Sequence, residues 1–340
     1  MRLLQKELLL YNDSFDNWEI IKAIPNSQNT VLSFSTTLHS SPIDSLFCVG
    51  TANGEVLLSK NGQDYLLKQP KISDTNTTFT SNILKIIRAG DTYTSCYLIL
   101  TTNNELYFSG DNLETVEKQR ALGGVYLDMA YFSDKFWVVG ENGFYVRASI
   151  IRRAGASGYK YSLSWESPTG FTSKNIQQIK FLNNTEDLIA IDYEYKNNLY
   201  YNYMYKYSYS SGWEVFRASI RDYNMVDVTS SASKMLSILS DSRLSIYNAT
   251  ENMPLIFDIQ INGSGITYCN GYYIACGTNG KIVVSDDLEN WKEFTIQDSQ
   301  GVNLSLKYIS SNEATGDIVA MDSNYLVYIN TKLLDKLMEL

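Results

Sequence analysis

The sequence YYIACGTNGKIVVSDDLENWKEFTIQD, residues 272–298, sets the pattern that the rest of the chain repeats. Residues 272–276 are an apolar run of strand-forming types, and Asn279 and Gly280 supply the positive φ angles that a tight hairpin needs. Residues 281–285 and 292–296 have the composition of two further short strands. The stretch therefore predicts three strands joined by two turns.

Similar units recur along the chain. Their hairpin turns fall near residues 54, 104, 143, 198, 242, 280 and 324, so the period is about 38 to 55 residues. The seven copies span residues 47–67, 97–116, 136–149, 188–216, 235–248, 272–296 and 317–330. Repeats of this length, each with about four short strands, are typical of β-propellers. We therefore predict an all-β fold consisting of a single propeller with seven blades; six or eight blades are the alternatives.

The two ends of the chain predict how the ring closes. Asn12, Ser14 and Trp18 repeat the spacing found at residues 285–291, whereas the last copy is incomplete. Strands from both termini sharing one sheet would remove the open seam of the ring. We expect closing strands in residues 1–23, blades in 24–330, and a terminal helix or tail in 331–340.

A polar motif follows the second strand of several copies. The motif has the form S-x-D-x-x-x-W, and its positions are Ser285, Asp287 and Trp291 in one copy, Ser59, Asn61 and Tyr65 in another, and Ser109 and Asp111 in a third. Side chains of this type cap backbone N–H groups in turns. The motif therefore predicts a repeated turn that fastens two strands, and not a catalytic site.

These residues resemble the Asp-box, or BNR, repeat, which sialidases, photosystem assembly factors and many bacterial and phage propellers share. Residues 271–294 are most similar to units of bacteriophage tail and other virion proteins. Departures from the family pattern are Leu288 and Asn112, where Gly is preferred, and Asn61 in place of Asp. Three copies lack the box. The resemblance implies a propeller fold and leaves the activity open.

Charge and hydropathy exclude several classes of protein. The net charge of −9 argues against nucleic acid as a partner and against adsorption to anionic lipid. No window of 18 residues is uniformly apolar, so we expect no membrane span. The apolar start of the chain is interrupted by Gln5, Lys6 and Glu7, which favours a strand of the fold over a signal peptide.

Cysteine and histidine usage argues against a metal site. Cys48, Cys96, Cys269 and Cys276 lack C-x-x-C spacing, and His39 is the one histidine. We expect unpaired, buried thiols and no metal. Asp286, Asp287 and Glu289 lack the spacing of a calcium loop, so a turn-capping role is favoured.

Catalytic signatures are also missing. The sequence has no P-loop, H-E-x-x-H, G-x-S-x-G or G-x-G-x-x-G motif, and no Arg-Ile-Pro start of the kind that sialidases have. We therefore expect no enzyme activity, no catalytic residues and no cofactor. The alternative is a glycoside hydrolase, which needs two carboxylates about 5 to 10 Å apart, and these could meet at the centre of a ring.

Two stretches that the repeat does not explain are candidate partner contacts. Tyr201, Tyr203, Tyr205, Tyr207 and Tyr209 alternate and so would lie on one strand face. Such a face suits protein or sugar recognition, or else it packs between neighbouring blades.

The second stretch, residues 147–160, is the most basic patch of an acidic chain and includes Arg152 and Arg153. It is either a docking loop for an acidic partner or a solvated hairpin.

The leading hypothesis is a structural, protein-interaction module of a bacteriophage virion, in the tail or near the portal, assembled in the host cytoplasm with other proteins and in several copies. This hypothesis rests on the similarity of residues 271–294 to repeat units of virion proteins and on the missing catalytic motifs. A propeller that binds carbohydrate or a receptor, such as a surface glycan, is the second hypothesis, and a glycoside hydrolase is the third.

Overall fold

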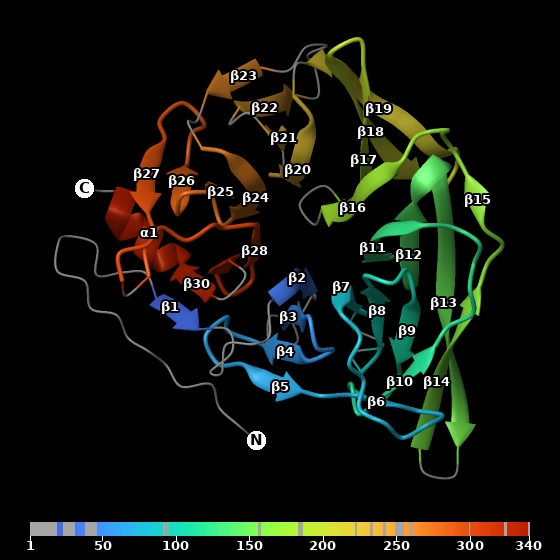
Figure 1. Cartoon of the computed structure of the whole chain (residues 1–340). Helices are drawn as coiled ribbons and strands as arrows, with labels where there is room; N and C mark the ends of the chain where they lie inside the picture. The colour runs from blue at the N-terminus through green and yellow to red at the C-terminus, as the bar shows by residue number, and fades with distance from the viewer. Residues whose placement is uncertain are drawn as a thin grey trace.

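The structure of the chain is a computed structural model. It describes residues 19–22, 31–37, 46–90, 93, 95–155, 158–182, 186–221, 223–231, 234–240, 243–248, 255–258, 261–298, 300–322 and 325–338. Within these residues, seven sheets stand around a central axis as the blades of a ring (Figure 1). The predicted all-β, seven-bladed propeller is therefore confirmed.

Each blade is built on four antiparallel strands, which follow one another in the sequence in every blade but blade 7; blades 2 and 3 each have a fifth, short strand. Blade 1 contains β2 (Val31–Thr37), β3 (Leu46–Thr51), β4 (Val56–Ser59) and β5 (Leu66–Lys68). Blade 2 contains β7 (Ile83–Arg88), β8 (Tyr97–Thr101), β9 (Leu106–Ser109) and β10 (Thr115–Lys118), with β6 (Lys71–Ile72) beside β10. Blade 3 contains β11 (Tyr126–Phe132), β12 (Lys135–Gly140), β13 (Phe144–Gly155) and β14 (Gly158–Trp165), with β15 (Thr169–Gly170) paired to β13 and the short helix η3 (Glu141–Gly143) between β12 and β13.

The remaining blades complete the ring. Blade 4 contains β16 (Ile176–Leu182), β17 (Asp187–Lys196), β18 (Leu199–Ser208) and β19 (Gly212–Arg221). Blade 5 contains β20 (Met225–Ser230), β21 (Lys234–Leu239), β22 (Arg243–Asn248) and β23 (Leu255–Asp258). Blade 6 contains β24 (Gly263–Cys269), β25 (Tyr272–Gly277), β26 (Lys281–Ser285) and β27 (Lys292–Thr295). Blade 7 contains β28 (Tyr308–Asn312), β29 (Asp317–Met321), β30 (Tyr325–Asn330) and β1 (Glu19–Lys22), and helix α1 (Thr331–Met338) follows β30.

Blade 7 joins the two ends of the chain. Strand β1 pairs antiparallel with β30, with Glu19 opposite Tyr328 and Lys22 opposite Tyr325. This pairing confirms that strands from both termini close the ring. The echo of the motif at Asn12, and the start of the chain expected to form a strand, lie outside the described residues.

The hairpin turns between the second and third strands use the residues that the sequence marks for them. Gly54, Asn104, Gly143, Asn198 and Gly280 all have positive φ angles. At Gly280 the constraint is double, because a Cβ there would lie 2.1 Å from the carbonyl oxygen of Ile296. The turns expected near residues 242 and 324 lie outside the described part of the chain.

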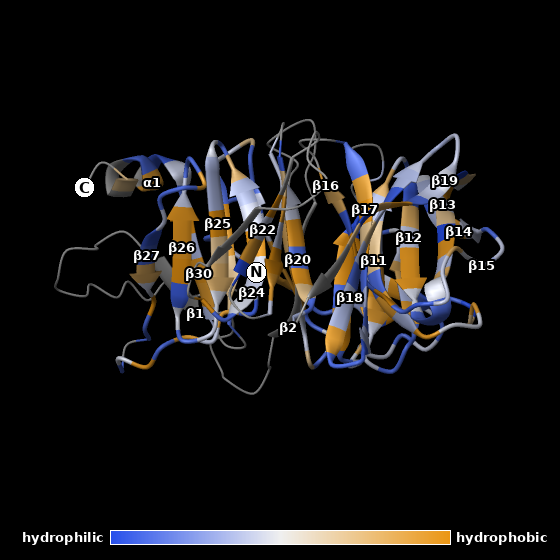
Figure 2. Cartoon of the chain, turned by 90° about the horizontal axis from the view of Figure 1, so that it is seen from above, coloured by the Kyte–Doolittle hydropathy of each residue, from blue (hydrophilic) through white to orange (hydrophobic). Residues whose placement is uncertain are grey.

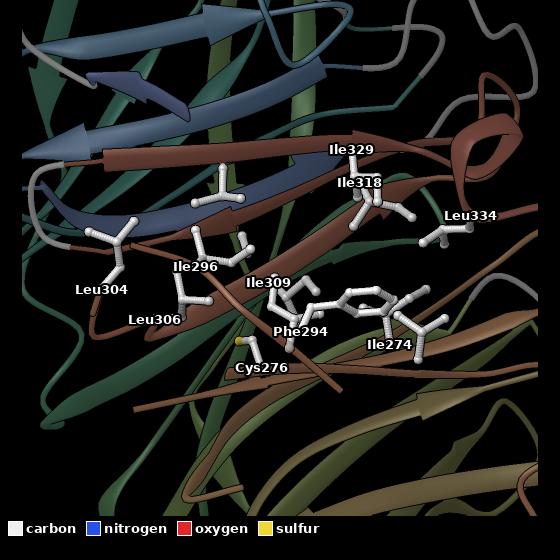
Figure 3. Close-up of a cluster of buried hydrophobic side chains, with 14 of the residues drawn as sticks. Ile274, Cys276, Phe294, Ile296, Leu304, Leu306, Ile309, Ile318, Ile329 and Leu334 are labelled. Atoms are coloured by element: carbon white, nitrogen blue, oxygen red, sulfur yellow. The ribbon is translucent and has the colours of Figure 1, made fainter. Parts of the chain in front are cut away.

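The core lies between the blades, because each sheet buries both of its faces against its neighbours. Figure 2 shows apolar segments along many of the strands, with more polar segments towards the two faces of the disc. Between blades 6 and 7, Ile274 and Phe294 pack against Ile309 and Ile318, and Leu334 of α1 joins them (Figure 3). Helix α1 is therefore held by the same core.

The four cysteines are buried and unpaired, as the sequence predicts. Burial raises the pKa of Cys48, Cys96 and Cys269 to about 12. A thiol with such a pKa stays protonated near neutral pH and is a poor nucleophile. The cysteines therefore act as small apolar side chains of the core.

Candidate functional site

The innermost strands surround a cavity on the axis of the ring. Strands β7, β11, β16, β20, β24 and β28 all contribute to its lining, and its volume is about 1220 Å³. The register of β7, β11, β16 and β20 with the next strand shifts by one residue just before Lys85, Asp128, Gln178 and Asp227. Because bulges re-aim the side chains that follow them, polar groups lie at equivalent heights in four successive blades.

The first of these groups ties blades 2, 3 and 4 together. The Lys85 ammonium lies 2.9 Å from Asp128 Oδ1, and the backbone N–H of Ile179 donates to Asp128 Oδ2 at 2.9 Å. Burial alone would lower the pKa of Lys85, but the charge of Asp128 and its hydrogen bond outweigh burial, so the pKa is raised. Lys85 therefore stays charged and paired.

A second group of the same design ties blades 4, 5 and 6. Lys180 Nζ lies 3.0 and 3.2 Å from the two carboxylate oxygens of Asp227, and the N–H of Ile266 donates to Asp227 Oδ2 at 3.0 Å. The side chain of Gln178 donates to the same carboxylate. We call this axial cavity the channel. Both of its aspartates, Asp128 and Asp227, bind partners in the adjacent blades and so hold the ring together.

Sequence reasoning missed these channel residues. A signal was present, since Lys85, Asp128 and Asp227 each stand as an isolated charge within a short apolar run at the start of a blade. An isolated charge in an apolar strand is expected to have a partner. The partner could not be inferred, because each pair joins residues about 43 to 47 positions apart.

Aromatic side chains gather at one mouth of the cavity, on the boundary between blades 3 and 4. Phe132 stacks on Tyr209 with ring centroids 5.8 Å apart, and it lies 5.2 Å from Phe181. We call these three residues the rim cluster. Tyr209 is 68% exposed, whereas the two phenylalanines are partly buried. The exposed carboxylates of Asp134 and Glu186 line the same mouth.

The five predicted tyrosines do not form one binding face. Strand β18 ends at Ser208, so Tyr209 lies in the following turn and joins the rim cluster. Tyr205 is only 5% exposed, and Tyr203 and Tyr207 are partly buried with it against blade 3. The packing alternative therefore describes Tyr203, Tyr205 and Tyr207, because blade 4 turns this side of β18 towards its neighbour. Tyr201, on the same side of the strand, is half-buried.

The centre of that interface is Trp137 of β12. Tyr207 meets it edge-on at 4.6 Å, Tyr145 stacks on it at 6.0 Å, and Trp213 lies perpendicular to it at 5.9 Å. The Arg147 guanidinium lies 5.1 Å from its ring and donates to the Tyr207 hydroxyl at 2.9 Å. An aromatic cluster of this size contributes both apolar burial and ring–ring contacts.

A buried carboxylate sits behind these tyrosines. Asp192 of β17 is buried, and neither of its oxygens has a hydrogen-bond partner of good geometry in the described chain. Burial raises the pKa of Asp192 to about 7, although the nearby charge of Lys174 acts in the opposite direction. Lys174 is itself paired with Glu194. Asp192 therefore changes charge near neutral pH.

Arg152 and Arg153 lie at the outer end of the β13–β14 hairpin and are exposed. The Arg152 guanidinium lies 3.3 Å from the ring centre of Tyr159 in the facing strand. The structure thus places both arginines on an extended hairpin of blade 3, and neither of them lines the channel.

The box of blade 6 forms a closed turn. Ser285 Oγ donates to Asp287 Oδ1 at 3.1 Å and accepts the N–H of Leu288 at 2.8 Å. The N–H groups of Glu289 and Asn290 donate to the same Asp287 oxygen, each at 2.8 Å. These bonds, with that of Asn290 first, lower the pKa of Asp287 well below its usual range.

The two other boxes are built in the same way. In blade 2, Ser109 Oγ donates to Asp111 Oδ1 at 2.9 Å, and Asp111 accepts the N–H of Thr115 at 3.0 Å. In blade 1, Ser59 Oγ donates to Asn61 Oδ1 at 3.1 Å.

In the box of blade 1, Asn and Asp have exchanged places relative to blade 6, and the hydrogen bond between their side chains is kept. Blade 1 has Asn61 and Asp64 where blade 6 has Asp287 and Asn290, and in each pair the asparagine side chain donates to the aspartate side chain. The ring below the turn is Tyr65 in blade 1 and Trp291 in blade 6, whose indole donates to Leu288 O at 3.3 Å.

Comparison with known proteins identifies the fold. No protein-family model and no curated protein matches the chain. Among solved structures, YCF48 from Cyanidioschyzon merolae matches with a TM-score of 0.65 and 11% identity, covering 93% of this chain and 99% of that one. A structure of YCF48 bound to D1 peptide matches with a TM-score of 0.60 and 11% identity, covering 96% and 99%. At this identity the likeness shows the propeller fold alone.

The predicted location in a virion, after assembly in a host cytoplasm, is wrong on this comparison. The matching solved structures reported above are YCF48 propellers, and neither is a virion protein. The prediction rested on a sequence motif that resembles the Asp-box turn. Such a turn occurs in propellers of many functions and does not indicate where a protein is located.

Two negative findings apply to the described part of the chain alone. None of its helices combines the length and the apolar character that a membrane span requires. No three of its His, Cys, Asp or Glu side chains gather closely enough to hold a metal ion.

Proposed function

We propose that this chain is a non-enzymatic β-propeller that binds a segment of a partner protein at the rim cluster. The observation that carries the proposal is the exposed ring of Tyr209, stacked on Phe132 at the mouth of the channel. Aromatic side chains lose little conformational entropy on binding and bury a large area, which is why they are enriched at interfaces.

The size of the cavity favours a polypeptide over a small ligand. Pockets for small molecules have volumes of about 300 to 1,000 Å³. The channel, at about 1220 Å³, exceeds that range and opens beside the rim cluster. A loop or chain end of a partner could place one side chain in the channel and rest its neighbours on Phe181 and Tyr209.

Two further observations support a binding role over a catalytic one. The channel aspartates, Asp128 and Asp227, are each held by a lysine and a backbone N–H, so their role is to join neighbouring blades. A propeller with a similar fold has been solved with a peptide bound, namely YCF48 with D1 peptide. We also propose that the turns at Ser59, Ser109 and Ser285 are Asp-box units, on the strength of their shared hydrogen bonds.

The test is a selection of peptides on the immobilised chain by mRNA display, followed by fluorescence anisotropy with the enriched peptides. We expect Tyr209→Ser to weaken binding by at least about tenfold, as loss of an interface anchor does. The matched control is Tyr195→Ser. Tyr195 belongs to the same blade and is 60% exposed. It lies near the end of the sheet where Lys196 pairs with Leu199, whereas Tyr209 follows the other end of β18, so loss of Tyr195 should leave the affinity unchanged.

Equal affinities for the two variants would refute the rim cluster as the site. Binding on a glycan array that is lost in Tyr209→Ser would replace the proposal with the carbohydrate-binding alternative. Turnover of fluorogenic glycosides by the purified chain would overturn the non-enzymatic assignment.

A further inference from the structure

The outer half of the β13–β14 hairpin extends beyond its own sheet. Pairing of β12 with β13 stops at Lys135 opposite Ser149, whereas β13 and β14 remain paired out to Gly155 opposite Gly158. We call residues 150–155 and 158–161 the basic arm. Figure 1 shows this hairpin reaching past the neighbouring strands of its blade. Within the described residues, the edge of β13 from 150 to 155 therefore has no strand beside it.

The arm is held in place at its base. Tyr161 packs over Gly110 of blade 2 so closely that a Cβ on Gly110 would lie 2.9 Å from the Tyr161 Cβ. The same ring meets Tyr93 edge-on at 6.0 Å. An isolated two-stranded ribbon is marginally stable, so these contacts with blade 2 position the arm before any partner arrives.

The charges of the arm are not balanced internally. The sequence has no Asp or Glu from Arg147 to Trp165. Arg153 stands directly opposite Lys160 in the register of the two strands. Like charges at directly opposed positions destabilise a strand pair. Among the described residues, neither of these two cations has an ion-pair partner.

We propose that the basic arm is a docking edge for an acidic, extended segment of a partner protein. The segment adds as a strand along residues 150–155 of β13 and places a carboxylate beside Arg153 and Lys160. Addition of a strand satisfies the unpaired backbone groups of the edge. The carboxylate converts a repulsive cross-strand pair into two ion pairs. This surface is distinct from the rim cluster and does not depend on it.

The observations favour a polypeptide strand over nucleic acid. An open strand edge offers a ladder of N–H and C=O groups that only another backbone can match. The net charge of −9 also repels a long polyanion, whereas a short acidic segment meets mainly the local cations.

The probe is a fluorescein-labelled peptide of about eight residues that alternates Glu with Val and Thr. We expect saturable binding to the full chain that weakens as salt is added. Reversing both charges with Arg153→Glu and Lys160→Glu should reduce affinity at least about tenfold. The matched control reverses two exposed lysines away from the arm, with Lys60→Glu and Lys332→Glu, and should bind within about twofold of the original chain.

Two comparison peptides separate strand addition from simple charge attraction. A peptide with Gln in place of Glu should bind much more weakly. A Glu peptide with a central Pro, which cannot complete the ladder, should also lose affinity by about tenfold. Hydrogen exchange adds a direct readout, since backbone amides of residues 150–155 should exchange more slowly when the Glu peptide is bound.

Several results would overturn the proposal. One is that the Glu peptide fails to bind, or binds the doubly reversed variant equally well. Equal affinity for the Pro peptide would reject strand addition. Tighter binding of single-stranded DNA with the same number of charges would assign the arm to nucleic acid. A dimer of the chain that disappears in the doubly reversed variant would make a second copy the occupant.

Discussion

Blades 4 and 6 have the same four-stranded topology but are stabilised in different ways. Blade 6 has short outer strands, and Ser285 and Asp287 close the turn between them with local hydrogen bonds. Blade 4 has three ten-residue strands and no box, and its turn carries Tyr209 instead. Its strands are fixed by Tyr205 and Tyr207, which pack against blade 3.

The comparison teaches that one blade architecture can be secured by local or by long-range contacts. Local turn chemistry involves residues a few positions apart and leaves the outer surface free. Long-range packing uses a strand face and commits it to the neighbouring blade. We therefore expect a candidate partner contact in blade 4 to lie where the packing ends, as Tyr209 does.

The largest effect should come from the long-range contacts. Trp137→Ala removes the ring at the centre of the interface between blades 3 and 4, and it should lower the free energy of unfolding by about 3 to 5 kcal/mol. Urea denaturation followed by circular dichroism measures the loss. The control is Trp291→Ala in blade 6, whose partly buried ring should cost less than half as much. Equal losses would contradict the distinction between the blades.

A smaller effect is expected in the turn of blade 6. Ser285→Ala removes the hydroxyl that accepts the buried Leu288 N–H, and an unpaired buried N–H costs about 1 to 3 kcal/mol. In the corresponding turn of blade 4, the Ser208 hydroxyl bonds, among the described residues, only to exposed Ser210. Ser208→Ala should change stability by less than about 0.5 kcal/mol. A larger loss at Ser208 would show that turn chemistry matters equally in both blades.

The two blades should also respond to pH in opposite directions. The pKa of Asp192 in blade 4 is raised to about 7, so its unfavourable contribution grows as pH rises from its ordinary value towards 7. Asp192→Asn should therefore stabilise the chain by about 1 to 2 kcal/mol at pH 8 and by little at pH 4.

The blade 6 counterpart is Asp287, whose pKa is lowered. Its stabilising contribution is present above the ordinary pKa of an aspartate and is lost as pH falls below it. Unfolding curves of Asp192→Asn and Asp287→Asn, recorded from pH 3 to pH 8, test both signs. Parallel pH profiles for the two variants would contradict the assignment.

The smallest effect compares two boxes. The Trp291 indole donates to Leu288 O, but the buried hydroxyl of Tyr65 in blade 1 has no partner among the described residues. Tyr65→Phe should therefore raise the free energy of unfolding by about 1 kcal/mol. Thermal denaturation detects a gain of this size. A loss would show that the hydroxyl is hydrogen-bonded in solution, by water for example.

The fold could be predicted from the sequence because the residues that form its turns lie close together in the chain. Asn279 and Gly280 are residue types that adopt positive φ angles at low cost, as they do here, and the spacing of Ser285 and Asp287 is that of a turn. These signals require no knowledge of neighbours in space. Counting the hairpin turns predicted seven blades, with six or eight as alternatives, and the structure has seven.

The candidate site could not be predicted in the same way. Lys85 finds Asp128 across a blade boundary, and alternation alone cannot show that Tyr205 is buried while Tyr209 is exposed. Both facts depend on how far each strand extends and on which blade stands beside it. Arg152 and Arg153 were recognised as unusual by charge, but the unpaired edge beside them follows from where β12 begins, at Lys135.

The pairing of β1 with β30 determines when this molecule can mature during synthesis. Residues 19–22 are translated about 300 residues before their partners in β30. Until then the seventh sheet is incomplete, and the apolar faces that blades 1 and 6 bury against it are exposed. Nascent chains must therefore be shielded from one another for most of translation, and closure is a late, long-range and slow step. A stalled or prematurely released product would be open along one side, which marks it for removal by the quality-control systems of the cell.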